Sequence, residues 1–375
     1  MIKRAFNSDV IDSAVLKAID ERAFPGAQIA IGDKDGIIYT ANYGYKRVFD
    51  DNAPCFDKEP VEFTGTKDPV TSDTLYDMAS CTKIMSTTMV ALRMIDEGKI
   101  ALYDSISRFI DVPEDKKGIE LRHLLTHTSG IKAHFLLEND GREASEAAQI
   151  VLDHPLSTPT GTKVEYTCMG YILLGKILEK LGDKPLDVLA EEMVWKPLGM
   201  YNTCYRPLDK GFTNIAATEY TEDLGAYKVG IVHDENARFL GGVSANAGVF
   251  SNAEDVATLA TMLSAGGVHK GKMFLSPSLM KLARTDMTAG LGEGRGLGFV
   301  VKQAGTLSAM GDLYPGGSFG HNGYTGTSMY LHGDNGLYVI ILGNRVHFTR
   351  NSDRIFRFRR TFHNLCTAEY ERASL

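Results

Sequence analysis

Strand-like segments occur near both ends of the chain, and a long helical stretch separates them. Two short strands, Ala27–Ile31 and Ile37–Tyr39, are predicted near the start. Two more, Ser328–His332 and Leu337–Leu342, flank an Asn-Gly turn near the end. Residues 104–290 carry mostly helical patterns. Because strands from both ends can pair in one antiparallel sheet, this order predicts an α+β fold with a second, helical lobe.

The order also predicts how the chain divides. Residues 1–100 and 290–375 are expected to form an α/β lobe that holds the antiparallel sheet. Helices over Ser8–Arg22 and from about Ser352 to Tyr370 are expected to flank this sheet. Residues 101–289 are expected to form a mostly helical lobe. A chain of 375 residues, 43% of them hydrophobic, can bury a core of this size.

Charge and hydropathy argue against several classes of partner. The net charge is -7 and no long basic run occurs, which argues against nucleic-acid binding. The cluster Arg354, Arg357, Arg359 and Arg360 is interpreted as a solvated helix face. No stretch approaches the roughly 18 apolar residues of a membrane span. The start, Met1–Asp9, lacks the apolar run of a signal peptide, so a cytoplasmic protein without a membrane partner is expected.

Cysteine and histidine spacing gives no sign of a metal site or a cofactor. His123 and His127 have the H-x-x-x-H spacing, but Leu124 stands where a metalloprotease has glutamate, so structural histidines are expected. The cysteines are odd in number and lack a C-x-x-C spacing, which favours reduced thiols. They are Cys55, Cys81, Cys168, Cys204 and Cys366.

Three Ser-x-x-Lys segments begin at Ser80, Ser129 and Ser278, and only the first opens a long helical pattern. Residues i and i+3 share a helix face, so Lys83 can reach the Ser80 hydroxyl. A partly buried lysine of lowered pKa is expected to accept the hydroxyl proton. A helix N-terminus also offers a free N–H group to an oxyanion. An alternative remains at this point, namely that Ser80 is a helix cap and Lys83 a surface cation.

Further segments resemble one family. Thr74–Lys83 resembles the nucleophile segment of the serine β-lactamase and penicillin-binding-protein superfamily. Leu121–Ile131, Tyr166–Tyr171 and Pro197–Met200 are similar to segments of its class C β-lactamase and family VIII esterase branch. Gly320–Gly326 stands where that branch has Lys-Thr-Gly or a His-x-Gly variant. The matches follow the family order along nearly the whole chain.

The resemblance implies a β-lactamase/transpeptidase-like fold, in which an antiparallel sheet flanked by helices accompanies an all-α lobe. It implies that Ser80 attacks the substrate and that Lys83 and Tyr166 share the proton transfer. The backbone N–H groups of Ser80 and Tyr324 would form the oxyanion hole. No cofactor is implied.

Two positions depart from the family pattern. His321, with Asn322 and Gly323, would lie on the strand beside the acyl group, and it replaces a lysine. With one lysine instead of two, the pKa of the Tyr166 phenol is lowered less, so an optimum above about pH 8 is expected. Cys168 stands where the family has an asparagine that contacts the acyl-amide of β-lactams and peptides. Because a thiol bonds weakly, an amide would be held less well, whereas an ester loses less.

These residues predict a serine hydrolase that cleaves a small ester or amide, first of all a carboxylesterase. A D-alanyl-type peptidase, a weak β-lactamase and an acyltransferase remain alternatives. An alternative of another class is a β-lactam-binding protein that is acylated without turnover. Cys168 as the nucleophile is also considered, but no helix N-terminus is expected to activate it. The physiological substrate and the oligomeric state are not indicated by the sequence.

Overall fold

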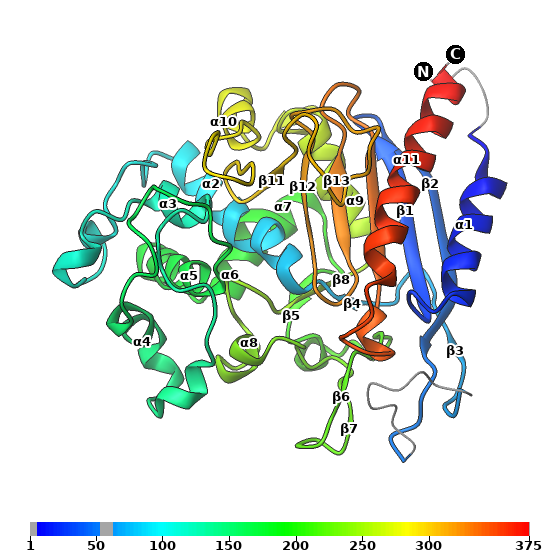
Figure 1. Cartoon of the computed structure of the whole chain (residues 1–375), viewed down its shortest axis with the longest axis horizontal. Helices are drawn as coiled ribbons and strands as arrows, with labels where there is room; N and C mark the ends of the chain where they lie inside the picture. The colour runs from blue at the N-terminus through cyan, green and yellow to red at the C-terminus, as the bar shows by residue number, and fades with distance from the viewer. Residues whose placement is uncertain (1–5, 53–62, 375) are drawn as a thin grey trace.

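The computed structural model describes residues 6–52 and 63–374. Its centre is a seven-stranded antiparallel sheet with the order β11-β12-β13-β14-β1-β2-β3 (Figure 1). The bounds of its strands are β1 Gly26–Asp33, β2 Gly36–Arg47, β3 Asp68–Pro69, β11 Val300–Val301, β12 Phe319–Asn322, β13 Ser328–Leu331 and β14 Tyr338–Gly343. Strands from the two chain ends meet where Ile29 in β1 lies opposite Ile341 in β14. The predicted antiparallel sheet from both ends is therefore confirmed.

The two central strands are buried on both faces, and their side chains alternate between two cores. Ile29 and Ile31 pack with α1 (Ser8–Asp20) and α11 (Arg354–Ser374), which cover one face of the sheet. Ala30 points to the opposite face, where α9 (Ala253–Ser264) packs. This alternation is the period of two that a strand imposes. Each fully buried Ile side chain contributes about 1.5–3 kcal/mol, so both helical layers are anchored to the sheet.

The middle of the chain is mostly helical, and it also contributes short strands. Strand β8 (Val249–Ser251) lies between β4 (Tyr76–Asp77) and β5 (Cys204–Tyr205). It thereby connects the segment before Ser80 to the middle of the chain. The remaining helices are α2 Thr88–Asp96, α3 Leu121–Leu125, α4 Ala147–Asp153, α5 Cys168–Gly182, α6 Leu186–Ala190, α7 Lys196–Leu198, α8 Glu235–Phe239 and α10 Pro277–Ala283. The remaining strands are β4 Tyr76–Asp77, β5 Cys204–Tyr205, β6 Tyr220–Thr221, β7 Ala226–Tyr227, β8 Val249–Ser251, β9 Val268–His269 and β10 Lys272–Met273. None of the described helices combines the length and the apolar character needed to cross a bilayer.

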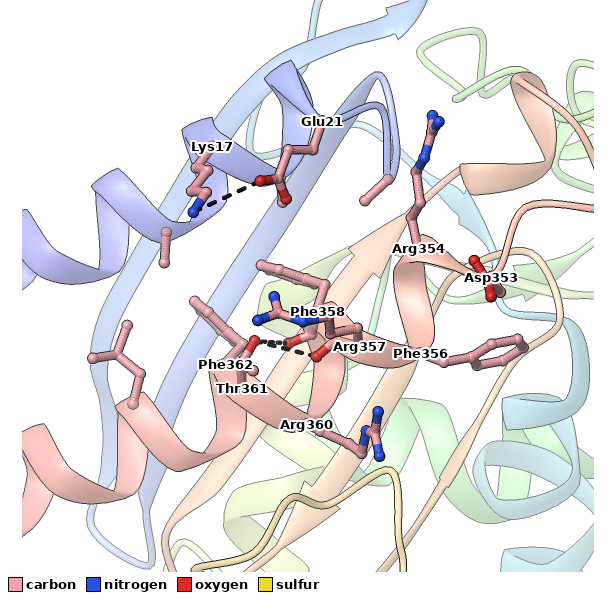
Figure 2. Close-up of a pocket in the computed structure, with 14 residues that line it drawn as sticks. Lys17, Glu21, Asp353, Arg354, Phe356, Arg357, Phe358, Arg360, Thr361 and Phe362 are labelled. Atoms are coloured by element: carbon pink, nitrogen blue, oxygen red, sulfur yellow. Dashed lines mark hydrogen bonds and ion pairs between the residues drawn. The ribbon is translucent and has the colours of Figure 1, made fainter. Parts of the chain in front are cut away.

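A groove of about 690 Å³ lies between α1 and the first turns of α11 (Figure 2). Lys17, Arg354, Arg357 and Arg360 line it, so these arginines lie at the surface, as the solvated-face interpretation requires. Arg359 on the same helix is an exception, because only 1% of it is exposed. The interpretation is wrong for this one residue, which points into the protein instead.

Candidate active site

Ser80 follows strand β4 at a strained turn. Ala79 has a φ of 45°, in the left-handed region, which costs an L-residue roughly 1–2 kcal/mol. The Asp77 carboxylate accepts hydrogen bonds from the backbone N–H of Ala79 at 2.8 Å and of His233 at 2.7 Å. It thereby fixes the strained backbone, and such strain often occurs at functional sites. The turn leads directly into a 3₁₀ helix, Ala79–Cys81, that carries Ser80.

Lys83 lies beside the Ser80 hydroxyl and is fully buried. Its Nζ donates to Oγ of Ser80 at 3.4 Å and to the backbone oxygen of Asn246 at 2.9 Å, and it lies 3.7 Å from Sγ of Cys168. The expected regular helix starts instead with the 3₁₀ turn and a π-helical turn, Lys83–Thr87, before α2 begins. Wide π turns recur at functional sites. The alternative of a surface lysine is therefore wrong.

The charge of Lys83 differs from the expectation. Burial lowers the pKa of Lys83, but the neighbouring Cys168 and Tyr166 raise it, and the net direction is upward. The sequence analysis expected a lowered pKa from burial alone, because it could not see which side chains surround the amine. The raising effect comes from the anionic forms of Cys168 and Tyr166, so Lys83 is protonated whenever either group is ionised, and its charge stabilises that anion.

Tyr166 is a half-buried residue in the segment before α5, and its phenol oxygen is buried. The centre of its ring lies 4.8 Å from Nζ of Lys83 and 4.6 Å from the ring centre of His127. Burial raises the pKa of Tyr166, and the Lys83 cation opposes this without reversing it. The phenol oxygen makes no hydrogen bond of ordinary geometry to any residue that the structure describes. It is therefore free to exchange a proton with a group that enters the site.

Cys168 is the first residue of α5, and the Thr167 hydroxyl caps this helix by accepting a hydrogen bond from Gly170 N at 3.1 Å. A helix N-terminus thus lies at Cys168, where the sequence analysis expected none to activate the thiol. Burial nevertheless raises the pKa of the Cys168 thiol more than Lys83 lowers it, so the thiol keeps its proton at neutral pH. A nucleophilic Cys168 is disfavoured by this charge state, since the thiolate is the reactive form.

His321 faces the same site from strand β12. The centre of its ring lies 5.9 Å from that of Tyr166, and burial, with Arg295 and Lys83, holds its pKa well below the ordinary value. The imidazole is therefore neutral, unlike the lysine that the family motif would place here. Asn322, the next residue, directs its side chain elsewhere, because its Oδ1 accepts from the Tyr330 hydroxyl at 2.8 Å.

Gly323 and Tyr324 form a turn that packs against the backbone before Ser80. A Cβ on Gly323 would lie 2.5 Å from the Met78 oxygen, so only glycine allows this close approach. The Thr325 hydroxyl donates to the backbone oxygen of Asp77 at 2.7 Å and fixes the turn. No hydrogen bond from the Tyr324 N–H is found within the described residues. Ser80 N–H lies in the first helical turn, where intrahelical acceptors are lacking, so both predicted oxyanion donors are available.

Arg295 supplies a second cation that the sequence analysis missed. Its guanidinium carbon lies 5.4 Å from the ring centre of Tyr166. The side chain is buried; one nitrogen contacts Glu293 at 2.5 Å, while Nε and Nη1 have no partner among the described residues. Arg295 follows a glycine-rich stretch with no distinguishing pattern, so no local signal could have identified it. The structure thus places two cationic side chains, Lys83 and Arg295, beside the ring of Tyr166.

The two histidines of the H-x-x-x-H segment serve the backbone. His123 Nδ1 accepts from the N–H of Glu120 at 3.0 Å, and His127 Nδ1 accepts from the N–H of Thr167 at 3.1 Å. His123 thereby caps the start of α3, and His127 fixes the segment that carries Tyr166. Among the described residues, no group of three or more His, Cys, Asp or Glu side chains is arranged to hold a metal ion.

Comparisons with known proteins test the predicted resemblance and fold. The family model described as Beta-lactamase matches residues 11–361. A relative from Salmonella typhi named "Putative D-alanyl-D-alanine carboxypeptidase" is 31% identical over 370 residues, covering 90% of this chain and 82% of its own. EstCE1, described as a hydrolase with promiscuous acyltransferase activity, has a TM-score of 0.71 at 22% identity and covers 94% of this chain and 97% of its own. A simvastatin synthase (LovD) mutant from Aspergillus terreus has a TM-score of 0.72 at 20% identity, with 97% of each chain covered. The predicted resemblance and fold are confirmed.

Proposed function

The chain belongs to the Beta-lactamase family, and from this premise we propose that it cleaves a small carboxylic ester through an acyl-enzyme on Ser80. One observation carries the proposal. The buried Nζ of Lys83 lies 3.4 Å from the Ser80 hydroxyl and 3.7 Å from the Cys168 thiol, where the family resemblance implies an asparagine amide. The first contact supports a serine nucleophile, and the second supports an ester substrate.

Acylation begins when Oγ of Ser80 attacks the carbonyl carbon of the ester. The hydroxyl proton passes to the phenolate form of Tyr166, which the Lys83 cation stabilises. The negative oxygen of the tetrahedral intermediate accepts hydrogen bonds from the N–H groups of Ser80 and Tyr324. The bond to the leaving alkoxide then breaks, Tyr166 returns the proton to it, and the alcohol departs.

Deacylation uses the same groups, with a water molecule in place of the Ser80 hydroxyl as the attacking group. The Tyr166 phenolate takes a proton from a water molecule, and the resulting hydroxide attacks the acyl carbon. The same two N–H groups stabilise the second oxyanion. When the intermediate collapses, Tyr166 returns the proton to Oγ of Ser80, and the carboxylic acid is released.

The thiol of Cys168 is the reason to favour an ester over an amide. An asparagine at this position could accept from, and donate to, an acyl-amide group, whereas a thiol is weak in both roles. A buried amide left without a partner costs about 1–3 kcal/mol. An ester that lacks this amide incurs no such cost, so esters are expected to react faster.

A D-alanyl peptidase is the second candidate, because the relatives at 31% identity are named for that activity. An acyltransferase would share the acylation half and differ only in the acceptor, an alcohol or amine in place of water. A β-lactam-binding protein without turnover would stop at the acyl-enzyme. All three share Ser80 as the acylated residue. They differ in whether the acyl group is released from the enzyme and in which acceptor takes it.

A fluorophosphonate probe with peptide mapping tests the nucleophile. We expect the label on Ser80, and none after Ser80→Ala. Ser278→Ala is the matched control, since Ser278 begins another Ser-x-x-Lys segment but is exposed on α10. Full labelling of the Ser80→Ala protein, or a label mapped to another residue, would exclude the mechanism.

Turnover of p-nitrophenyl butyrate, nitrocefin and a D-alanyl-D-alanine peptide then distinguishes the candidates. Steady hydrolysis of the ester, much faster than that of the other two, is the expected result. Preferred cleavage of the peptide identifies a peptidase. A single burst without turnover identifies a binding protein, and product transfer to an added alcohol identifies an acyltransferase.

A further inference from the structure

Arg359 projects from the last helix, α11, to the turn formed by Gly323 and Tyr324, which carries one of the proposed oxyanion donors. Its Nη2 donates to the backbone oxygens of Gly323 at 3.1 Å and Thr327 at 2.7 Å. Only 1% of the residue is exposed, and no carboxylate within the described residues forms an ion pair with it. Burial lowers the pKa of Arg359 to about 10, which still leaves it charged at neutral pH. The cation is therefore buried with backbone carbonyls as its partners.

The acceptor at Gly323 is special because of the peptide group to which it belongs. The carbonyl of Gly323 and the N–H of Tyr324 are the two ends of one planar, conjugated unit. A charged donor at the carbonyl oxygen draws electron density toward that end, so the N–H becomes a stronger donor. This N–H is the group that faces the oxyanion in the proposed mechanism.

We propose that Arg359 is a positioning residue that polarises the Gly323–Tyr324 peptide and thereby strengthens the Tyr324 N–H as an oxyanion donor. The inference rests on the proposed function, since it requires an acyl-enzyme whose oxygen lies at this turn. A buried charge without a carboxylate partner is costly. A role in the electrostatics of the site gives a reason for this cost that packing alone does not.

A second arginine that bonds to the same turn, Arg345, provides a control. Arg345 is also buried, and its Nε donates to the Tyr324 oxygen at 2.8 Å. That oxygen belongs to the next peptide group, Tyr324–Thr325, so Arg345 holds the turn without bonding the carbonyl opposite the Tyr324 N–H. Replacing either arginine removes a buried guanidinium that bonds to this turn. Only Arg359 donates to the Gly323 carbonyl, which shares a peptide group with the Tyr324 N–H.

The test is the infrared frequency of the acyl-enzyme carbonyl. A slowly released acyl group with a carbon-13-labelled carbonyl is loaded from its p-nitrophenyl ester onto the wild type, Arg359→Met, Arg359→Lys and Arg345→Met. A weaker donor polarises the acyl carbonyl less, so its band moves to higher frequency. We expect this shift in Arg359→Met, a smaller one in Arg359→Lys, and none in Arg345→Met. Deacylation of Arg359→Met should slow roughly tenfold, less than the roughly 100-fold or more that follows the loss of a whole donor.

The outcomes separate this inference from the proposed function. If the wild type gives no acyl band, the acyl-enzyme itself is excluded. If the band forms but Arg359→Met leaves it unmoved, the polarising role is excluded. An equal shift in Arg345→Met would also exclude it, because a loosened turn would then explain both. Should Arg359→Met fail to fold, as judged by thermal unfolding, an unshifted band in folded Arg359→Lys overturns the proposal.

Discussion

The Nζ of Lys83 lies 3.7 Å from Sγ of Cys168, in the position where the resemblance leads one to expect an asparagine amide. An amide at this place could bond to the lysine through its oxygen and to a substrate through its nitrogen. The thiol does neither well. The contact therefore links one substitution in the sequence to the class of acyl compound that the site is proposed to accept.

Cys168→Asn is expected to move the preference toward amides. A new hydrogen bond to the acyl-amide is worth about 1 kcal/mol, so the ratio of kcat/KM for nitrocefin to that for p-nitrophenyl butyrate should rise roughly fivefold. Steady-state kinetics on both substrates measure the ratio. Cys168→Ala, which removes the thiol without adding an amide, is the control and should leave the ratio unchanged. An unaltered ratio in a folded Cys168→Asn protein would contradict this role.

The rate is expected to increase with pH. Burial raises the pKa of Tyr166, so the phenol keeps its proton at neutral pH. The reactive phenolate is then a small fraction that grows about tenfold per pH unit until its pKa is approached. The profile of kcat/KM between about pH 6 and 9 should show this rise, and Tyr166→Phe should abolish it. A plateau already present near pH 6 is incompatible with a phenolate base.

Local patterns were enough to predict the sheet and the proximity of Lys83 to Ser80. The apolar strand pattern around Ile29 and the Asn-Gly hairpin near the C-terminus are encoded within a few residues, and so is the spacing of Ser80 and Lys83. The start of α5 could also have been found, because Thr167 is a good helix cap.

The rest of the site depends on contacts between distant segments. Arg295 and Arg359 reach Tyr166 and Gly323 from other parts of the chain, and an isolated arginine has no pattern that reveals its partner. The charge of Lys83 was mistaken for a related reason. Burial alone lowers a lysine pKa, and only the folded arrangement shows that a phenol and a thiol beside it reverse the direction.

Gly323→Ala is expected to impair both activity and stability. The added Cβ would lie 2.2 Å from the Thr327 hydroxyl oxygen and 2.5 Å from the Met78 backbone oxygen, so the turn must move. Overpacking of this kind costs about 1–3 kcal/mol, and displacing the Tyr324 N–H should lower kcat about 100-fold. Ester kinetics and chemical unfolding measure the two effects. Gly118→Ala, where a Cβ meets no atom within 4 Å, is the control and should change neither. Wild-type kcat in Gly323→Ala would show that the turn takes no part in catalysis.

Acid is expected to destabilise the protein through His347. Its ring accepts from Val48 N at Nε2 and contacts the Thr218 oxygen at Nδ1, both at 3.0 Å, so the folded state holds it neutral. Burial lowers the pKa of His347 to about 4, against about 6.5 in the unfolded chain. As pH falls from about 6.5 to 4, the unfolded chain binds a proton that the folded state does not, and roughly 3 kcal/mol of stability is lost. Urea unfolding across this range should therefore show a smaller loss in His347→Gln, whereas exposed His134→Gln should match the wild type. Equal losses in all three proteins would mean that another group governs the acid response.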